Sequence, residues 1–422
     1  MNNRPTNARP TSVLTIAHNH PAFHPGGAEI LAHDLFRSFA AWPKVTSYFL
    51  AAIDPAYRNP HPGTSIQARP GEPNVFLYRG AGFDPMSMMT RDLPRLVREL
   101  GELLRDLAPD VVVLHHLNWF GIELLALLRR VRPKARVIFV AHDFYLMCPN
   151  DGLMVTTDGD RLCRRQSHDG CRQCFPGRPV GFFQARRADL LRHLDLVDWV
   201  VAPSRLVAGR LVEWGVPEAR VRVIANGLPE TGEGGPRRPS DGVDRFGVFG
   251  NMRRTKGTLV VLEAARRLVR DGFDRFQVNL YGEPLFQPPE FVERLEALCA
   301  ELAGVVVRHG RYERDRVGAL MAANDWIAMP STWWENAPLT IREAHAAGRP
   351  VLASGIGGMA EAVADGVDGR HVAAGDSQAW ADAISTCTGN RELWDRLAAN
   401  LPAPRGVAAV AAEYRTLFGA AA

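Results

Sequence analysis

Two glutamates, Glu335 and Glu343, stand eight positions apart and are the carboxylates best placed for chemistry. Pro338 lies between them, and proline is favoured at the start of a helix because its missing N–H would have no intrahelical partner there. A helix is therefore predicted over residues 338–347, with Gly348 ending it. Glu335 then lies in the loop before the helix, and Glu343 lies about one and a half turns inside it.

The start of this helix is suited to binding an anion. Backbone N–H groups near Asn336, Ala337 and Leu339 would lie at the positive end of the helix dipole, where a diphosphate binds favourably. Glu343 would then reach the vicinal hydroxyls of a ribose, and Glu335 would lie beside the atom linked to the phosphate. The alternative is a surface helix with two ordinary glutamates, because this spacing alone is common by chance.

Four of the six cysteines form a second group with chemical potential: Cys148, Cys163, Cys171 and Cys174. In a reducing compartment such a group, ending in a C-x-x-C pair, indicates a metal rather than disulfides. Four thiolates make a closed tetrahedral site of the kind that zinc occupies. An iron ion, an iron–sulfur cluster or four free thiols are the alternatives, since the spacings match no standard zinc ribbon. Such a metal would fold the loop and would not catalyse.

The elements that position these residues alternate between strands and helices. Short runs that are apolar at every position indicate strands buried on both faces, as in parallel sheets. The expected strands are residues 12–17, 110–114, 136–140, 199–202, 221–224, 246–249, 277–281, 326–329 and 350–353, and helical patterns lie at residues 93–107, 258–270 and 291–302. The fold class is therefore α/β, and so many strands favour two doubly wound, Rossmann-like sheets.

We expect an N-terminal domain over residues 1–203 and a C-terminal domain over residues 204–404, with a last helix near residues 405–422 packing back on the first domain. Ligands of such sheets bind at the carboxyl ends of the strands, so the two domains are expected to face each other across a cleft. The polar segments 1–12 and 231–241 are expected to be disordered.

Composition narrows the class of function. The 422 residues are 46% hydrophobic and 23% charged, with a net charge of +4. This mild charge does not indicate nucleic-acid binding, which needs a denser basic stripe, but it is compatible with phosphorylated ligands or an anionic lipid surface. No apolar run is long enough to span a membrane, and the N-terminus lacks a signal-peptide core. We therefore expect a cytoplasmic location, which includes the inner face of the cell membrane.

The stretch around the two glutamates resembles the signature of the retaining glycosyltransferases of family 4, which have the GT-B fold. The matching residues are Pro330-Ser331, Glu335, Pro338-Leu339, Glu343-Ala344, Ala347-Gly348, Pro350-Val351, Ala353-Ser354, Gly357-Gly358 and Glu361. The resemblance implies that Glu343 holds the ribose of a nucleotide sugar, that Glu335 lies near the anomeric carbon, and that the backbone at Asn336, Ala337, Pro338 and Leu339 cradles the distal phosphate.

Residues 249–257 resemble the phosphate-binding loop of that family. There an arginine and a lysine neutralise the leaving diphosphate, which gains negative charge in the transition state. Lys256 is in place, but Asn251 stands at the arginine position, so Arg253 or Arg254 would substitute, or Asn251 would donate a hydrogen bond. A solvated basic loop is the alternative.

Other motifs extend the resemblance over nearly the whole chain. Gly26-Gly27 is similar to a turn that approaches the donor phosphate, and His142 is similar to a histidine that contacts the donor sugar. A plain strand-to-helix turn and a structural histidine are the alternatives. Residues 224–227 match a structural motif, and residues 310–312 match the base pocket. His115, His116, Asn118 and Trp119 follow a predicted strand, where they either touch the acceptor or are structural.

The resemblance implies metal-independent retaining transfer from a UDP- or GDP-sugar to a glycan or lipid-linked glycan, for a cell-surface or exported polysaccharide. Residues 182–193 form a basic amphipathic helix, which either contacts an anionic membrane or packs its apolar face in the core. Two rival functions are a GT-B nucleotide-sugar epimerase and a non-catalytic nucleotide-sugar-binding module. The glutamate signature with Gly357-Gly358 argues against the epimerase. Asn251 is the one hint of a binding module, and the intact glutamates and Lys256 argue against it.

Overall fold

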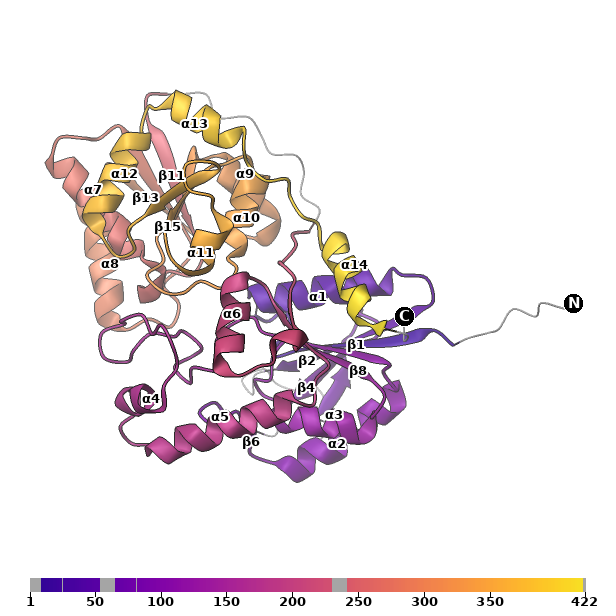
Figure 1. The fold of residues 1–422 in the computed structure, drawn as a ribbon. Coiled ribbons are helices and arrows are strands. Elements are labelled where there is room, and N and C mark those ends of the chain that lie inside the picture. The colour runs from indigo at the N-terminus through magenta and orange to yellow at the C-terminus, as the bar shows by residue number, and fades with distance from the viewer. Residues whose placement is uncertain (1–8, 25, 54–64, 81, 230–240, 420–422) are drawn as a thin grey trace, which may run out of the picture. The chain divides into compact units, whose positions relative to one another are not determined.

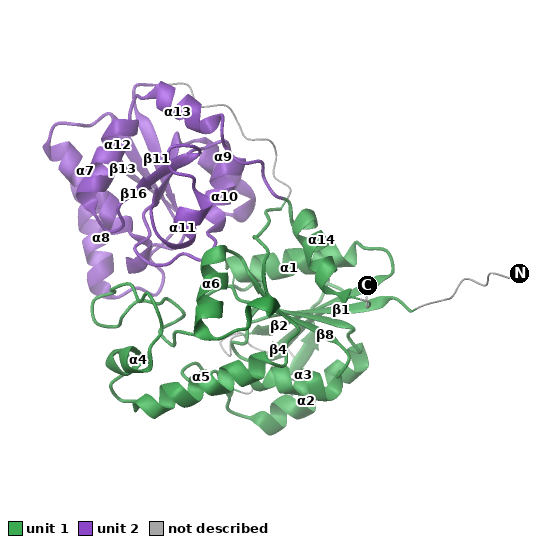
Figure 2. Ribbon diagram, viewed as in Figure 1, with its two compact units in different colours: residues 1–229, 406–422 green, residues 230–405 purple. Residues whose placement is uncertain are grey.

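The computed structural model describes residues 9–24, 26–53, 65–80, 82–229 and 241–419. The chain forms two compact units, coloured separately in Figure 2. Unit 1 comprises residues 1–229 and 406–422, and unit 2 comprises residues 230–405. Each is an α/β unit built on its own parallel sheet, which confirms the predicted fold class of two Rossmann-like domains.

Unit 1 is built on an eight-stranded sheet in the order β10-β9-β8-β7-β1-β2-β4-β3, in which only β3 runs antiparallel to its neighbour. Its strands are β1 (Thr11–Ala17), β2 (Val45–Ile53), β3 (Ile66–Ala68), β4 (Val75–Arg79), β7 (Val111–Leu114), β8 (Arg136–Val140), β9 (Trp199–Ala202) and β10 (Val221–Val223). A separate small hairpin pairs β5 (Phe83–Asp84) with β6 (Met89–Thr90). The central strands are buried along nearly their whole length, as expected for a sheet covered on both faces.

Helices lie on both faces of this sheet (Figure 1). The helices of unit 1 are α1 (Gly27–Ala40), α2 (Leu93–Leu107), α3 (Glu123–Val131), α4 (His168–Cys174), α5 (Val180–Leu194), α6 (Arg205–Trp214), the 3₁₀ turn η1 (Glu218–Arg220) and α14 (Val407–Leu417). Helix α4 contacts α5 and does not cover the sheet. The last helix, α14, packs against α1 although it follows unit 2 in sequence. Val410, Tyr414 and Leu417 share a core with residues of α1 and of the central strands.

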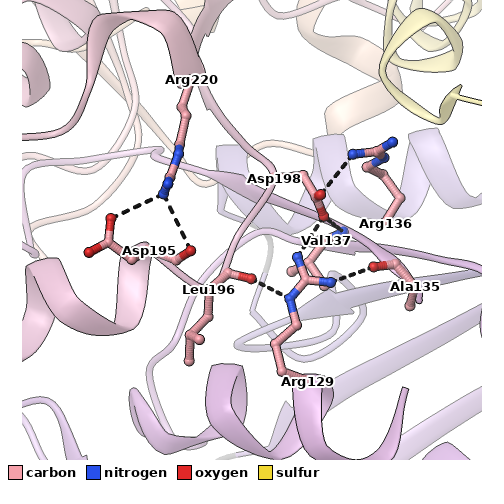
Figure 3. A network of polar contacts seen from close by, with 8 residues as sticks. All are labelled: Arg129, Ala135, Arg136, Val137, Asp195, Leu196, Asp198 and Arg220. Carbon is pink, nitrogen blue, oxygen red and sulfur yellow. Dashed lines mark hydrogen bonds and ion pairs between the residues drawn. The ribbon is translucent and has the colours of Figure 1, made fainter. Parts of the chain in front are cut away.

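An ion-pair network fastens α3 to the strands at the amino ends of β8 and β9 (Figure 3). Asp198 accepts hydrogen bonds from Arg129 at 2.6 Å, from Arg136 at 2.7 Å and from the backbone N–H of Val137 at 2.8 Å. Burial opposes ionisation of the Asp198 carboxyl, but these donors outweigh it and lower its pKa. This network stabilises the sheet at the edge opposite the carboxyl ends of its strands.

Unit 2 is built on a six-stranded parallel sheet in the order β13-β12-β11-β14-β15-β16. Its strands are β11 (Asp244–Phe249), β12 (Phe276–Tyr281), β13 (Val306–Gly310), β14 (Trp326–Met329), β15 (Val351–Ser354) and β16 (Gly369–Val372). Its helices are α7 (Thr258–Arg270), α8 (Pro289–Glu301), α9 (Val317–Ala322), α10 (Leu339–Ala346), α11 (Gly357–Ala362), α12 (Ser377–Cys387) and α13 (Arg391–Ala398), with 3₁₀ turns η2 (Arg254–Lys256) and η3 (Arg314–Arg316). Separate apolar clusters fill the two sides of this sheet.

The units divide between residues 229 and 230, whereas the boundary predicted from the sequence lies between residues 203 and 204. The intervening segment belongs to unit 1 because β10 pairs with β9 and α6 packs beside them. Gly227 follows β10 and approaches α14 closely, where an added Cβ would lie 2.9 Å from Val410 and 3.0 Å from the Val407 backbone. Thr11 and Ser12 lie in β1 and are not disordered, while the other polar segment, residues 231–241, lies outside the described residues except Asp241.

Candidate active site

In unit 2, strand order brings three loops to one edge. Strands β11, β14 and β15 are consecutive in the sheet and parallel, so their carboxyl ends meet at the same edge. The loops that follow them hold residues 250–257, 330–338 and 355–358. These are the segments on which the sequence analysis places the candidate donor-binding residues.

Glu335 is the centre of this group. Its side chain is buried, and its Oε1 accepts hydrogen bonds from Lys256 Nζ at 2.6 Å, Ser331 Oγ at 2.6 Å and Trp333 Nε1 at 2.9 Å. Lys256 Nζ also lies 5.5 Å from the centre of the Trp333 ring. A buried carboxylate held by a cation and two neutral donors is fixed in position and compensated in charge. Motifs predict Glu335 and Lys256 as site residues, whereas Ser331 enters only as part of the signature and Trp333 not at all.

Two glycines allow the loops to approach this closely. Gly257 has φ of +72°, and a Cβ at this position would lie 1.9 Å from the Pro330 carbonyl oxygen. A Cβ on Gly358 would lie 2.2 Å from the carbonyl oxygen of Asn336. Both contacts are with backbone atoms, which cannot turn aside as a flexible side chain can. Glycine is therefore required for the three loops to meet.

Helix α10 begins one residue later than predicted. Pro338 is its N-cap, with an extended backbone (ψ of 118°), and Leu339 is the first helical residue. No side chain caps this helix start, and Pro338 itself has no N–H to offer. The amides at the helix start therefore belong to Leu339 and the residues after it, while Asn336 and Ala337 lie in the preceding loop.

Glu343 lies in α10, where burial raises the pKa of its carboxyl and the positive charge of Arg314 opposes the shift. Burial and the charge of Glu343 together raise the pKa of Tyr312 to about 12. Glu343 is thus an electrostatic neighbour of Arg314 and of Tyr312, and Tyr312 is the last residue of segment 310–312, which is predicted to form the base pocket. The structure brings these two predicted groups together.

The remaining predicted residues of unit 2 lie in the loop after β11. Asn251 is half-buried, and its Oδ1 has no hydrogen-bond partner among the described residues. Arg253 is exposed and precedes the turn η2 that carries Lys256. Gly282 packs closely against Gly250, the residue before Asn251. A Cβ on Gly282 would lie 2.0 Å from the carbonyl oxygen of Gly250.

In unit 1, the carboxyl ends of β1, β7 and β8 gather histidines. His142 follows β8, and its Nε2 lies 2.8 Å from Nδ1 of His115, which follows β7 and is fully buried. Burial lowers the pKa of His142 to about 4, although Asp143 opposes the shift, and burial holds the pKa of His115 well below its usual value. Both rings are therefore neutral near neutral pH. His116 pairs with Asp143 at 3.0 Å.

The predicted glycine turn precedes α1 and carries a buried glutamate. Gly26 is the N-cap of the helix and Gly27 is its first residue. Glu29 folds back toward this turn, so a Cβ on Gly26 would lie 2.3 Å from its Oε2. Burial would raise the pKa of Glu29, but contacts with His18 at 2.9 Å and His24 at 3.4 Å lower it well below its usual range. The pairing of His18 with Glu29 could not be predicted from the sequence, because the order of the strands in the sheet decides which residues become neighbours.

His20, His33 and Glu72 are the only three described residues of ligating type whose ligand atoms all lie within 4.8 Å of one another. Arg69 already supplies a cation here: it pairs with Glu72, and its Nη1 lies 3.2 Å from His20 Nε2. Burial and the Arg69 charge lower the pKa of His20 to about 3. A metal ion would have to share this position with the guanidinium, so the group is better suited to holding the loop.

The four predicted cysteines lie in one segment of unit 1. Cys148 follows β8, Cys163 follows an isolated bridge between Val155 and Leu162, and Cys171 and Cys174 lie on α4. All four are partly buried, and none forms a disulfide. Beside them is a cavity of about 360 Å³ that sequence reasoning did not predict. It is lined by Met147, Met154, Arg165, Gln166, Ser167, His168, Asp169, Arg187, Arg210, Glu213 and Trp214.

The basic amphipathic segment 182–193 lies in α5. The apolar residues Phe183, Leu190 and Leu194 of α5 are buried in unit 1, and so is Arg186. Arg186 donates to the carbonyl oxygens of Met86, Leu146 and Tyr145 at 2.6–2.8 Å. The apolar side of α5 is therefore core. No helix among the described residues is long and apolar enough to cross a membrane.

Comparison with known proteins places this arrangement in a family. Residues 25–231 match the family described as Glycosyltransferase Family 4, and residues 244–390 match the family described as Glycosyl transferases group 1. The chain belongs to glycosyltransferase family 4. The predicted membership is thereby confirmed.

Curated relatives of this family 4 chain match over part of their length. A D-inositol 3-phosphate glycosyltransferase of Corynebacterium urealyticum is 38% identical over 144 residues, 33% of each chain. One from a Nocardioides species is 30% identical over 227 residues, 49% of each chain. The chain thus matches about half or less of the length of these relatives.

Solved structures confirm the GT-B fold. Anabaena HepE in complex with UDP aligns with a TM-score of 0.67 and 18% identity, over 96% of this chain and 98% of HepE. Sucrose-phosphate synthase from Thermosynechococcus elongatus aligns with a TM-score of 0.71 and 19% identity, over 97% of this chain and all of the other. At such identities the likeness shows the fold alone.

Proposed function

We propose that the chain is a retaining glycosyltransferase that moves a sugar from a nucleotide-diphosphate sugar to a glycan or lipid-linked glycan acceptor. The observation that carries the proposal is the contact of half-buried Lys256 with buried Glu335 at the carboxyl edge of the unit 2 sheet; Glu335 lies four residues before α10 begins. This contact joins a cation, a fixed carboxylate and a helix start, which together suit a sugar linked to a diphosphate.

Each residue of the unit 2 edge has a proposed role. Lys256 and the amides at the start of α10 hold the diphosphate, with Asn251 and Arg253 beside it. Glu343 accepts hydrogen bonds from the ribose, since its side chain lies close to residues 312–314. Glu335 lies near the anomeric carbon. Because Ser331 and Trp333 hold one oxygen of Glu335, the carboxylate is presented in a single orientation.

The proposed chemistry is transfer on one face of the sugar. The leaving diphosphate gains negative charge as its bond to the sugar breaks, and Lys256 and the helix start stabilise that charge. The same diphosphate takes the proton of the acceptor hydroxyl. Transfer of this kind needs neither a pair of acid and base carboxylates, as in glycosidases, nor a catalytic metal. In unit 1, Gly26 and Gly27 approach the donor phosphate, and His142 contacts the donor sugar.

The proposed donor is a UDP- or GDP-sugar, and UDP is the first choice. HepE structures are described with UDP and with UDP-glucose, which supports the uridine nucleotide. The proposed pathway is synthesis of a cell-surface or exported polysaccharide, in the cytoplasm or at the inner face of the membrane. Peripheral contact with anionic lipid is proposed for the basic side of segment 182–193, on which Arg192 is exposed, since the apolar side of α5 is occupied by core packing.

The test measures nucleotide binding through protein stability. A ligand at about a hundred times its dissociation constant stabilises the folded state by about 2.7 kcal/mol, which raises the melting temperature visibly. We expect UDP or GDP to raise the melting temperature of the wild type and of Glu293→Ala, an exposed glutamate on α8, but much less that of Glu343→Ala. A full shift in Glu343→Ala would contradict the ribose role.

Product analysis separates the rival functions. A transferase joins the donor sugar to an added acceptor with retained configuration, an epimerase returns an isomeric nucleotide sugar, and a binding module returns the donor unchanged. Binding without any product on a panel of glycan acceptors would favour the module. The epimerase is the second candidate only through its shared GT-B fold, and no side chain among the described residues favours it.

A further inference from the structure

The segment that carries the four cysteines has almost no apolar core of its own. From residue 156 to residue 182 not one residue is buried, and all of them are described. Helix α4, in the middle of this stretch, buries none of its residues. Ordering a chain costs about 1–2 kcal/mol per residue in backbone entropy, and burial does not offset that cost here. Segments of this kind are usually held by a disulfide or a metal ion.

The backbone brings the four cysteines into one neighbourhood. Cys171 and Cys174 are three residues apart on α4 and so share a side of that helix. Thr157 donates to the carbonyl oxygen of Cys174 at 2.8 Å, which places the hairpin before Cys163 against α4. The N–H of Cys163 donates to Met154, and Asn150, two residues after Cys148, donates to Val155.

Arg186 supplies a second, independent indication. Its side chain is buried, it donates to three backbone carbonyl oxygens, and no carboxylate in the described part of the chain forms an ion pair with it. Two of these carbonyl oxygens belong to Tyr145 and Leu146, three and two residues before Cys148, so the buried guanidinium lies beside the start of the cysteine segment. A zinc ion with four thiolates carries a net charge of −2 and would compensate this buried cation.

We propose that Cys148, Cys163, Cys171 and Cys174 bind one structural Zn²⁺ ion that folds residues 148–174 onto Arg186. In this structure no three of the four sulfurs lie within 4.8 Å of one another. Cys163 instead donates to the carbonyl oxygen of Arg165, and Cys171 accepts from Gln166. Binding therefore replaces these contacts by rotation of the side chains and releases the thiol protons.

The bound ion would also shape the cavity of unit 1. Arg165, Gln166, Ser167, His168 and Asp169, which form one wall of that cavity, lie between the second and third cysteines. Gln166 bonds both to Cys171 and to Trp214 on the opposite wall. Zinc binding would thus affect the shape of this cavity, which is not part of the proposed donor site.

The test is metal analysis of the full-length protein, purified without chelators or a metal-binding tag. We expect about one zinc per chain by mass spectrometry of the elements in the wild type. The matched control is Cys299→Ser, which removes a half-buried thiol from α8 outside the group. It should keep the zinc, whereas the double variant Cys171→Ser/Cys174→Ser should lose it and become sensitive to proteolysis between residues 148 and 178.

A second measurement covers the case in which the double variant fails to fold. Cobalt(II) added to the chelator-treated wild type should give the intense absorption of tetrahedral thiolate coordination, and zinc should displace it. The proposal is overturned if zinc-grown wild type contains no zinc, if the double variant retains it, if an iron–sulfur chromophore appears, or if intact mass shows disulfides among these cysteines.

Discussion

At the scale of single residues, the candidate site depends on side chains whose partners come from distant parts of the sequence. Glu335 and Lys256 could be predicted from motifs, but the roles of Ser331 and Trp333 as further donors to Glu335 could not. In unit 1 the same applies to His115, whose importance follows from its contact with His142. A motif shows which residues to consider, whereas the loop geometry decides which atoms meet.

His115 has the position of a residue that fixes the tautomer of His142. It is fully buried, its Nδ1 lies 2.8 Å from His142 Nε2, and its own Nε2 has no hydrogen-bond partner among the described residues. A buried N–H without a partner is less favourable than a buried lone pair. His115 therefore donates from Nδ1, and His142 carries its proton on Nδ1.

We expect His115→Phe to lower kcat about 10- to 100-fold while the KM for the donor changes little, because a misaligned His142 impairs positioning rather than binding. His115→Asn, whose amide can donate to His142, should restore part of the loss. The measurement is steady-state sugar transfer, with the melting temperature followed for each variant. Equal losses in both variants that parallel a fall in melting temperature would show that His115 is only structural.

At the scale of elements, the long amphipathic helices could be predicted well. The structure has α2 at Leu93–Leu107 and α7 at Thr258–Arg270, as the apolar period indicates. Helix α10 starts a residue late because Pro338 has an extended ψ and serves as the cap. Strands β2, β3, β4, β13 and β16 lie outside the expected ranges; for example, polar or small residues interrupt β2, and β16 spans only four residues with a polar centre. Sheet pairing, and not local sequence, completes them.

The contact of the loop after β11 with the loop after β14 gives a prediction about Gly257. Alanine there must adopt φ of +72° and also meet the Pro330 carbonyl oxygen at 1.9 Å. Gly272 has φ of +77° and no atom within 4 Å of an added Cβ. Alanine at this position therefore measures the cost of the backbone conformation alone. We expect Gly272→Ala to lower the free energy of unfolding by about 1–2 kcal/mol and Gly257→Ala to lower it clearly more.

Urea unfolding of both variants measures this difference. Gly257→Ala should also lose nucleotide-dependent stabilisation, because Lys256 moves with the loop, while Gly272→Ala should keep it. Equal destabilisation in the two variants would mean that the loops separate without cost and that their close approach is not required.

At the scale of the whole molecule, both units bury neutral histidines. Burial lowers the pKa of His142 and of His345 to about 4, and burial together with Arg69 lowers that of His20 to about 3, from an ordinary value of 6.5. The unfolded chain therefore binds protons between these values that the folded chain does not. Stability rises with pH wherever the unfolded state binds more protons, so it is lost as pH falls from 6.5 toward 4.

We expect the urea midpoint to be lower at about pH 5 than at about pH 7. His345→Gln, which cannot be protonated, should weaken this dependence, because His345 is buried and its pKa shift is removed. Asp198, whose pKa is lowered, adds a further loss only below its ordinary value of 3.8. A midpoint that does not change between the two pH values would contradict the assignment of these histidines as buried and neutral.

The return of α14 to unit 1 has a consequence for how the protein is made. Val410, Tyr414 and Leu417 complete the core beside α1 and the central strands, yet they are translated after all of unit 2. Domains of larger proteins generally fold in order as they leave the ribosome. Here the apolar surface of unit 1 that α14 covers stays exposed while unit 2 is synthesised. Unit 1 is therefore the first unit to begin folding and the last to complete it. During that interval its exposed apolar surface is open to chaperone binding.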